Sequence, residues 1–429
     1  MSYSASADFI VREGSNGHRV RDTHLGINFL YGLDDPQGDW LRRGLKVGMK
    51  MARWPGGSIA ESDPSFLEHY IEEAHRRDWT RLDDPSPGAL HKFLKAVGSH
   101  NIKPTIVIPV RRYLEGREDP DFKQAERELG AFIDAVMAYR FGSVPINVWE
   151  LGNEFMFGRP RIDPELYGSF CVWLANLLRK KAVYPIQIGI QGANWTRGGL
   201  TRLARSISET DKKSFDFLIH HSYVRELGKA NHRGILRDYR RTWGQIPVYF
   251  SEWNAKSDRD TPNAMMSYGM KQASVMAHMF ADIIKHNVRY AALWPLQQNN
   301  KTSAFAAEGR GLDTPYVAGA VFRWLSDLLG YQQYDVSRTH CSTTCLWAYG
   351  ACGKLTILVA TNDEAERTIT VELPFRPASV SAERMYGSRN TPRSCPRITP
   401  MDVEGSGNVL LFRGNVEGPN ELLRIRTLI

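Results

Sequence analysis

Two glutamates stand at the ends of apolar, β-rich runs in this sequence, where each could act as an acid, a base or a nucleophile. Glu154 lies in "NVWELGNEFMF", which begins at residue 147, and Glu252 lies in "IPVYFSEWN", which begins at residue 246. A carboxylate among buried apolar and aromatic side chains is costly to ionise unless it has a partner. We therefore expect Glu154 either to be kept partly protonated for chemistry or to pair with a group elsewhere in the chain.

These two runs belong to an alternation of short β-rich and longer amphipathic segments between residues 23 and 330. Eight strand candidates occur, at residues 23–30, 50–57, 103–110, 145–154, 185–194, 214–223, 246–254 and 288–298. The segments between them, such as "DPELYGSFCVWLANLLRKK", carry apolar residues at three- and four-residue spacing, as helices do. Eight strand and helix pairs predict an α/β protein with a (β/α)8 TIM barrel over residues 23–330. A doubly wound sheet is the alternative, but no Gly-x-Gly-x-x-Gly follows the first strand.

The two ends of the chain have a different pattern. From residue 331 to residue 429 short alternating runs such as "KLTILVATND" and "RTITVELP" are separated by Gly, Asn, Asp and Pro. They predict an appended antiparallel β-sandwich domain. The opening "DFIVREGSNGHRV" indicates a β-hairpin with an Asn-Gly turn. We expect residues 1–22 to pack into that same domain.

Polar residues at the ends of the predicted barrel strands are the candidates for the site, because catalytic side chains of this fold come from the carboxyl ends of the strands. The candidates are Arg53 on the second strand, Asn153 and Glu154 on the fourth, His221 and Tyr223 on the sixth, Glu252 on the seventh and Trp294 on the eighth. We expect the carboxyls of Glu154 and Glu252 to face each other across the barrel mouth. Two carboxyls about 5 to 5.5 Å apart are the arrangement of retaining glycoside hydrolysis.

Their surroundings give the two glutamates different expected roles. Arg53 and Tyr223 are placed to donate hydrogen bonds to Glu252 and keep it ionised, as a nucleophile requires. The negative charge held there, with burial by Phe155 and Phe157, should raise the pKa of Glu154. Glu154 is therefore expected to be the acid/base.

The motifs carry a family resemblance. "WELGNE", "FSEWN", "RWPGG" and "HHSY" on the fourth, seventh, second and sixth strands resemble the motif set of clan A retaining glycoside hydrolases. The patterns are similar to those of the α-L-arabinofuranosidases and of the β-xylosidase and α-L-iduronidase family, which includes exopolysaccharide hydrolases. The resemblance spans nearly the whole chain. It implies acid/base for Glu154, a contact to the sugar 2-hydroxyl for Asn153, nucleophile for Glu252 and nucleophile support for Arg53 and Tyr223.

Other residues of the strand ends have simpler explanations. Glu150 lies about one layer deeper than Glu154, some 13 Å back at ~3.3 Å per residue, which favours a buried structural pair. His220 and His221 point to opposite faces of their strand and lack an acidic neighbour at ligand spacing, so we expect no metal. His221 is the one expected to reach the site. The cysteines at positions 341, 345, 352 and 395 match no usual zinc spacing and are expected to be small buried hydrophobes.

Aromatic and basic residues near the strand ends could contact a sugar. Seven aromatic side chains fall there: Trp54, Tyr113, Phe155, Phe157, Trp195, Trp253 and Trp294. We expect Trp294 first, and Trp195 second, to stack on a sugar ring. Eight arginines share these loops, at positions 111, 112, 117, 159, 161, 197, 225 and 259, and would suit an acidic glycan. Acidic residues in the same loops favour ordinary salt bridges instead.

Composition excludes several other classes of protein. The chain has 429 residues, and its 55 basic and 47 acidic residues are interleaved, so the net charge of +8 does not indicate nucleic-acid binding. An odd number of cysteines, five, without a C-x-x-C pair argues against a disulfide scaffold. No run approaches the roughly 20 apolar residues of a membrane span, and the lack of an export signal points to the cytoplasm.

The sequence thus predicts a retaining glycoside hydrolase that acts on an oligosaccharide or polysaccharide without a metal or organic cofactor. The bond is expected to be an O-glycosidic one in a xyloside, an arabinoside or an acidic exopolysaccharide. Three alternatives stay open: a glycan-binding protein on a hydrolase scaffold, a transglycosylase, and a metal-dependent barrel enzyme that uses His220 or His221.

Overall fold

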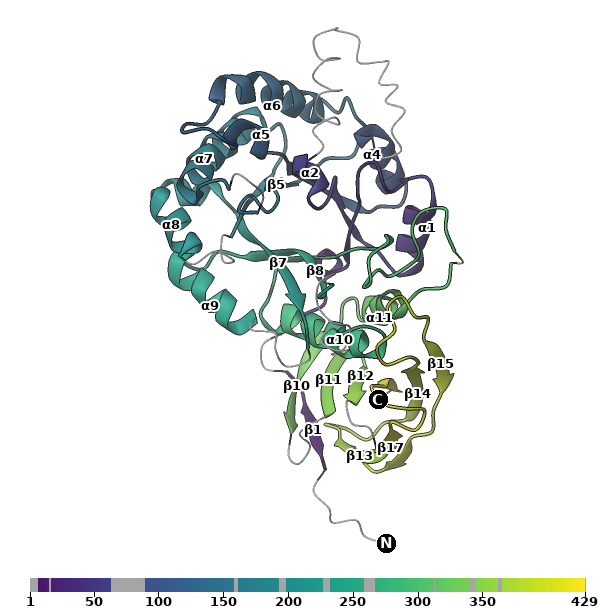
Figure 1. Cartoon of the computed structure of the whole chain (residues 1–429). Helices are drawn as coiled ribbons and strands as arrows, with labels where there is room; N and C mark the ends of the chain where they lie inside the picture. The colour runs from purple at the N-terminus through teal and green to yellow at the C-terminus, as the bar shows by residue number, and fades with distance from the viewer. Residues whose placement is uncertain are drawn as a thin grey trace.

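The architecture follows from a computed structural model of the chain (Figure 1). The structure describes residues 7–14, 17–62, 89–157, 161–192, 198–226, 232–257, 267–311, 313–338, 344–361 and 365–428. Five residues named in the sequence predictions lie outside these ranges: Arg159, Trp195, Arg197, Arg259 and Cys341.

Eight parallel strands form a closed barrel in chain order, and the first pairs with the last, so the TIM-barrel prediction is confirmed. The strands are β2 (Gly26–Asn28), β3 (Met51–Trp54), β4 (Lys103–Ile108), β5 (Val148–Leu151), β6 (Gln187–Gln191), β7 (Phe217–Val224), β8 (Val248–Ala255) and β9 (Tyr290–Leu293). They are buried almost throughout, which explains why their sequences are near-continuous apolar runs.

Helices surround this barrel (Figure 1). They are α1 (Asp39–Lys46), α2 (Ile59–Ser62), α4 (Leu90–Gly98), α5 (Arg111–Leu114), α6 (Phe122–Met137), α7 (Pro164–Lys181), α8 (Gly199–Ser206), α9 (His232–Trp243), α10 (Met270–Lys285) and α11 (Val317–Ser326), with short 3-10 turns at Asp22–His24 and Asp211–Ser214. The sequence encodes α7 clearly. The Asp163 side chain accepts a hydrogen bond from the Glu165 amide at its start, Pro164 occupies the first turn, and three basic residues end it.

A second, ten-stranded sheet follows the barrel, in the order β15-β14-β18-β12-β11-β10-β1-β13-β17-β16. Its strands are β1 (Phe9–Arg12), β10 (Gln332–Arg338), β11 (Thr344–Ala351), β12 (Lys354–Thr361), β13 (Arg367–Glu372), β14 (Ser379–Tyr386), β15 (Arg397–Pro400), β16 (Glu404–Ser406), β17 (Val409–Gly414) and β18 (Leu422–Leu428). The sheet curls around its own apolar core, to which Phe9, Ile357, Val371 and Ile425 belong. The appended β domain is therefore present.

The N-terminal segment joins this sheet in a different way from the predicted hairpin. β1 pairs antiparallel with β10 and parallel with β13, so one ladder of the sheet is parallel. Arg19, beyond the Asn-Gly sequence, forms a bridge with Gln332 of β10 instead of returning along β1. The hairpin prediction is wrong because both sides of the turn find a longer partner strand, which comes from the other end of the chain.

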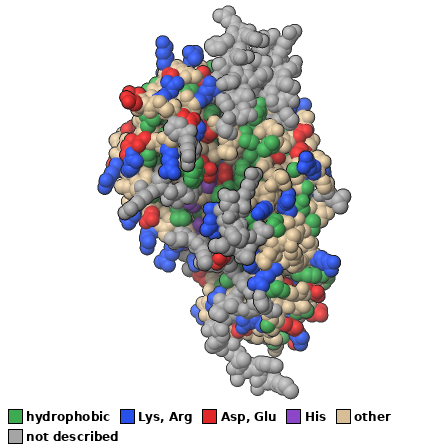
Figure 2. All heavy atoms as spheres, in the orientation of Figure 1, with side chains coloured by type: hydrophobic (Ala, Val, Ile, Leu, Met, Phe, Trp, Pro, Cys, Tyr) green, Lys and Arg blue, Asp and Glu red, His purple; other side chains and the backbone are tan. Residues whose placement is uncertain are grey.

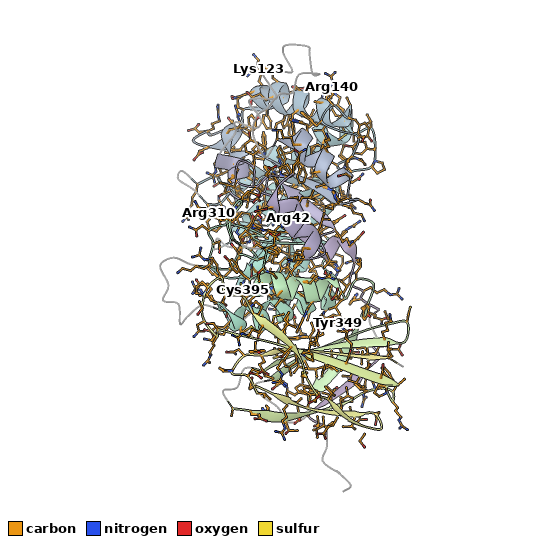
Figure 3. The ribbon with its side chains drawn as sticks, turned by 90° about the vertical axis from the view of Figure 1, so that its right-hand side faces the viewer. Arg42, Lys123, Arg140, Arg310, Tyr349 and Cys395 are labelled. Carbon is orange, nitrogen blue, oxygen red and sulfur yellow. The ribbon has the colours of Figure 1, made fainter. Side chains whose placement is uncertain are left out.

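The barrel and the second sheet share one apolar core at their junction. Trp347, Tyr349, Leu358 and Met385 of the second sheet belong to the same buried cluster as the barrel residues. Figure 3 shows the two parts stacked end to end, with Tyr349 and Cys395 labelled close to where they meet, and Figure 1 shows α10 and α11 at the junction. No helix in the described ranges is long and apolar enough to cross a membrane.

Candidate active site

The carboxyl ends of the barrel strands bring the two predicted glutamates together. Glu154 follows β5 and Glu252 lies in β8, and carboxylate oxygens of both, with Nδ1 of His221, lie within 4.8 Å of one another. Figure 2 shows red acidic and purple histidine side chains gathered in the hollow of the barrel. The arrangement expected from the strand ends is therefore present in space.

A left-handed turn after β5 aims Glu154. Gly152 has φ +77° and Glu154 has φ +47°, a conformation that costs a non-glycine residue about 1–2 kcal/mol. A Cβ atom on Gly152 would lie 2.7 Å from Val110 Cγ2, so only glycine fits there. Beyond the turn, the Phe155 ring stacks on Tyr167 with centroids 3.7 Å apart. The strained backbone of Glu154 is thus fixed by the packing of the residue that follows it in the chain.

A β-bulge aims Glu252. His220 pairs with Phe250, but His221 pairs with Glu252, so Ser251 has no partner residue on β7. Such an extra residue re-aims the side chains that follow it. The carboxylate of Glu252 is almost fully buried, and it accepts hydrogen bonds from Arg53 Nη1 at 2.9 Å and from the Tyr223 hydroxyl.

Arg53 connects the groups at the base of the site. Its Nε donates to both oxygens of Glu150, at 2.9 and 3.0 Å. Nη1 also donates to Asn28 Oδ1, and Nη2 donates to Asn153 Oδ1, each at 2.9 Å. Burial lowers the pKa of Arg53, but the charges of Glu150 and Glu252 outweigh it, so the pKa is raised and the guanidinium stays charged. The predicted buried partner of Glu150 is therefore Arg53.

The pKa of Glu154 differs from the sequence prediction. Burial raises it, but the hydrogen bond from His221 Nδ1 to Oε1, at 2.8 Å, and the charges of His221 and Arg53 lower it by more. The aromatic burial that we expected is absent, because Phe155 turns away onto Tyr167 and Phe157 is 48% exposed. The prediction of a raised pKa is therefore wrong, because His221 and Arg53 hold the pKa of Glu154 below its ordinary value.

Two amide side chains complete the polar surroundings. Asn153 uses its Oδ1 for Arg53 but has no hydrogen-bond partner for its buried Nδ2 among the described residues. An unpartnered buried donor beside the carboxylates of Glu154 and Glu252 is suited to a substrate hydroxyl. Gln191, at the end of β6, places its Nε2 3.2 Å from His221 Nε2. It therefore fixes the imidazole from the side opposite Glu154.

The predicted aromatic contacts divide into two groups. Trp54, Tyr113, Phe155 and Trp253 are buried in the core and are unavailable to a sugar. Trp294 is half-buried at the end of β9, and its ring lies over Gly57, where a Cβ would be 2.3 Å from the indole. Gly57 of "RWPGG" thus leaves room for Trp294, which stays the stacking candidate.

The two adjacent histidines point to opposite faces, as expected. His220 lies against Tyr239 and Phe250 in the helix layer, whereas His221 enters the barrel. The sequence showed no acidic neighbour for His221, but Glu154 and Glu252 both reach it, and these three are the one group of potential metal ligands among the described residues. Arg53 already neutralises Glu252 from the other side, so the site has less need of a cation.

The remaining predicted alternatives lose support. Cys345 is half-buried and Cys352 and Cys395 are exposed, so the prediction that they are small buried hydrophobes is wrong. Cys345 lies near the start of β11 and Cys352 directly follows its end, about 23 Å away at ~3.3 Å per residue, so these two cannot bind one zinc ion. Among the loop arginines, Arg111 pairs with Glu115, Arg112 with Glu128 and Arg117 with Asp121. Salt-bridged loops therefore account for three of the basic residues that suggested an acidic glycan.

Two residues of the site were missed. Gln191 ends β6, so the rule of polar strand ends would have found it. Glu61 lies in the short helix α2, where no pattern in the sequence marks it. Its carboxylate nevertheless accepts a hydrogen bond from the backbone amide of Asn153 at 2.9 Å.

Comparison with solved structures supports the fold strongly. An α-L-arabinofuranosidase from Thermotoga maritima superposes with a TM-score of 0.70 at 12% identity, with 99% of this chain and 100% of that chain covered. A family 51 α-L-arabinofuranosidase from Bifidobacterium longum gives 0.69 at 13% identity, and a family 30 endoxylanase from Clostridium papyrosolvens gives 0.65 at 12% identity, each with 99% of this chain and 100% of the other covered. No protein-family model matches the chain, and no curated protein matches it by sequence. The chain thus has the barrel and appended β domain of these glycoside hydrolases.

Proposed function

We propose that the protein is a retaining glycoside hydrolase that works through a covalent glycosyl-enzyme intermediate. The observation that carries the proposal is that carboxylate oxygens of Glu154, which follows β5, and Glu252, in β8, lie within 4.8 Å of each other. Retaining enzymes place their carboxyls about 5–5.5 Å apart, whereas inverting enzymes leave about 6.5–9.5 Å for a water molecule.

The surroundings assign the roles. Glu252, which accepts hydrogen bonds from Arg53 and Tyr223, attacks the anomeric carbon as the bond to the leaving oxygen breaks, and Glu154 gives that oxygen a proton. Water then attacks the same carbon, Glu154 takes its proton, and the Glu252 carboxylate is released. Asn153 Nδ2 is placed to donate to the sugar 2-hydroxyl, a bond that strengthens in the transition state.

One step follows from the low pKa of Glu154. The proton donor must first be protonated, and His221 Nδ1 is the group in contact with its oxygen. Protonation of Glu154 must therefore take place against this hydrogen bond, which favours the ionised form of the carboxylate.

Pentose-containing glycans are the first substrates to test, since the similar structures are named arabinofuranosidases and xylanases. The decisive experiment is a screen of aryl xylosides, arabinofuranosides, glucosides and glucuronides, together with acidic exopolysaccharides. Glu252→Ala should abolish turnover, with a loss of about 10⁴-fold or more. Glu126→Ala, an exposed position on α6, is the matched control and should retain full activity. Full activity in Glu252→Ala would reject the nucleophile assignment.

The same screen separates the alternatives. A transglycosylase would transfer the sugar to an added alcohol in preference to water, and a glycan-binding protein would bind the products without turnover. The metal-dependent alternative rests on Glu154, His221 and Glu252 as ligands. Full activity after dialysis against a chelator would exclude it, whereas loss of activity restored by a divalent cation would favour it over the proposal.

A further inference from the structure

Glu61 occupies a position that the proposed chemistry does not use. It lies in α2, which follows the second barrel strand β3. Oε2 accepts hydrogen bonds from the backbone amides of Val110 at 2.9 Å and Arg111 at 2.8 Å, and Oε1 accepts from the amide of Asn153 at 2.9 Å. One side chain thus connects the loops that follow β3, β4 and β5.

Arg111 holds the same turn from its other end. Its Nη2 donates to the carbonyl oxygens of Phe155, at 3.1 Å, and Phe157. Glu154 therefore lies between two anchors, the Asn153 amide bound by Glu61 and the carbonyls bound by Arg111. Since the Arg111 amide is itself bound by Glu61, the two anchors form one unit around the left-handed Glu154.

We propose that Glu61 is a positioning residue: by binding the backbone amide of Asn153, it keeps the neighbouring acid/base Glu154 in its reactive orientation. Its kinetic consequences rest on the proposed glycosidase function, whereas its structural role does not. Space for the carboxylate is provided by Gly152, where an added Cβ would lie 3.1 Å from Glu61 Oε1.

Only an ionised carboxylate fits this position well. It offers two acceptor oxygens to three N–H groups, whereas a glutamine or a protonated glutamate would point a donor at one of them. Burial raises the pKa of Glu61 to about 7, against the opposing effect of the amide hydrogen bonds and the Arg111 charge. The other titratable groups that face it are Tyr113 of α5 and Tyr167 and Cys171 of α7. Protonation as the pH falls through about 7 should therefore weaken the anchor.

The kinetic experiment compares Glu61→Gln with the parent on aryl glycosides of graded leaving-group ability. We expect kcat to fall about 100-fold for poor leaving groups, because a displacement near 1 Å has that effect, with a smaller loss for good leaving groups and little change in KM. In the parent, protonation of Glu61 should lower kcat as the pH falls through about 7. Glutamine does not titrate, so this part of the pH dependence of kcat should be absent in Glu61→Gln. Glu61→Asp keeps the charge and should restore part of kcat together with that pH dependence. Glu118→Gln, an exposed position in the loop after α5, is the matched control and should behave as the parent.

Hydrogen exchange tests the anchor without any substrate. In Glu61→Gln the amides of Val110, Arg111 and Asn153 should exchange at least tenfold faster than in the parent, while the amides of α7 stay unchanged. If Glu61→Gln does not fold, Glu61→Asp and the parent below pH 7 provide the comparison. Unchanged exchange at Asn153 overturns the anchor, and an equal kcat loss across leaving groups overturns the positioning role. If the parent cleaves no glycoside while these amides respond, the proposed function fails and the anchor stands.

Discussion

Arg53 Nε lies 2.9 and 3.0 Å from the two carboxylate oxygens of Glu150, and neither side chain is exposed to solvent. Removing one partner of such a buried ion pair is strongly destabilising, because the other charge is then left buried without compensation. Because the same guanidinium also contacts Glu252, the buried pair and the proposed nucleophile share one positive charge.

The first prediction is that Arg53→Met lowers the free energy of unfolding by about 3–5 kcal/mol, because Glu150 is left buried without a partner. Urea denaturation at neutral pH measures the change. Adding Glu150→Gln to Arg53→Met should recover at least about 1 kcal/mol, since it removes the unpaired charge. If the effects of the two substitutions simply add, the pair is not energetically coupled and its assigned role is wrong.

The second prediction concerns Glu154→Gln, which keeps the size of the side chain but removes its ability to act as an acid or a base. Glycosides with poor leaving groups should lose about 10³-fold in kcat/KM, because their departure depends on proton donation. Aryl glycosides with good leaving groups should lose much less in the first step. A series of substituted phenyl glycosides measures the dependence, and equal losses along the series would remove the acid role.

The barrel was predictable because its information is local. Each strand is a short apolar run and each helix has a regular apolar face, so the sequence pattern alone predicts all eight strands from β2 to β9. The polar strand ends then gave most of the site, because parallel strands in a barrel deliver their carboxyl ends to one face. Arg53, Asn153, Glu154, His221, Tyr223 and Glu252 lie together for this reason, while their catalytic roles stay predictions.

What the sequence could not give depends on contacts between distant segments. The bulge at Ser251 is set by the pairing of β7 with β8 and has no mark in the sequence. The pKa of Glu154 was predicted in the wrong direction because a histidine 67 positions away controls it. Likewise, the Asn-Gly sequence predicts a hairpin partner for β1 close by in the chain. Its actual partners, β10 and β13, lie more than 300 residues further along.

The third prediction tests His221 as the group that lowers the pKa of Glu154. In His221→Ala the burial of Glu154 remains but the hydrogen bond and the nearby charge are lost, so the pKa of Glu154 should rise. A proton donor loses activity as the pH rises through its pKa, so the basic limb of kcat/KM should move to higher pH. The pH profile with an aryl glycoside measures this shift. His220→Asn, which alters the helix-facing neighbour, should leave the limb in place, and a limb that does not move in His221→Ala refutes the assignment.

The fourth prediction concerns stability and a buried histidine at the closure of the barrel. Burial and the charge of Arg21 lower the pKa of His24 from 6.5 to about 3, and Nε2 bonds to the Val288 carbonyl next to β9. The unfolded chain binds a proton below about pH 6.5, but the folded chain does so only near pH 3, so stability falls as the pH falls through this window. Between neutral pH and pH 5 the loss should be about 2 kcal/mol.

Urea denaturation at several pH values measures that dependence. His24→Gln cannot gain a proton, so its free energy of unfolding should fall less than the parent's by about this amount over the same range. His100→Gln, an exposed position, is the matched control and should keep the parent's slope. Parallel curves for the parent and His24→Gln would show that His24 does not contribute.

The last prediction concerns Trp294, the proposed stacking surface for the sugar. Gly57 has φ +59°, and a Cβ there would lie 2.3 Å from the Trp294 indole, so Gly57→Ala must move the ring or the loop. If Trp294 stacks on the substrate, Gly57→Ala and Trp294→Ala should both raise KM about tenfold, equivalent to ~1.4 kcal/mol, with a smaller effect on kcat. The double variant should be no worse than Trp294→Ala alone, since the glycine acts through the ring. Initial rates with the best glycoside of the screen give KM and kcat for the two single variants and the double variant. An unchanged KM in Trp294→Ala would show that the sugar does not stack on Trp294.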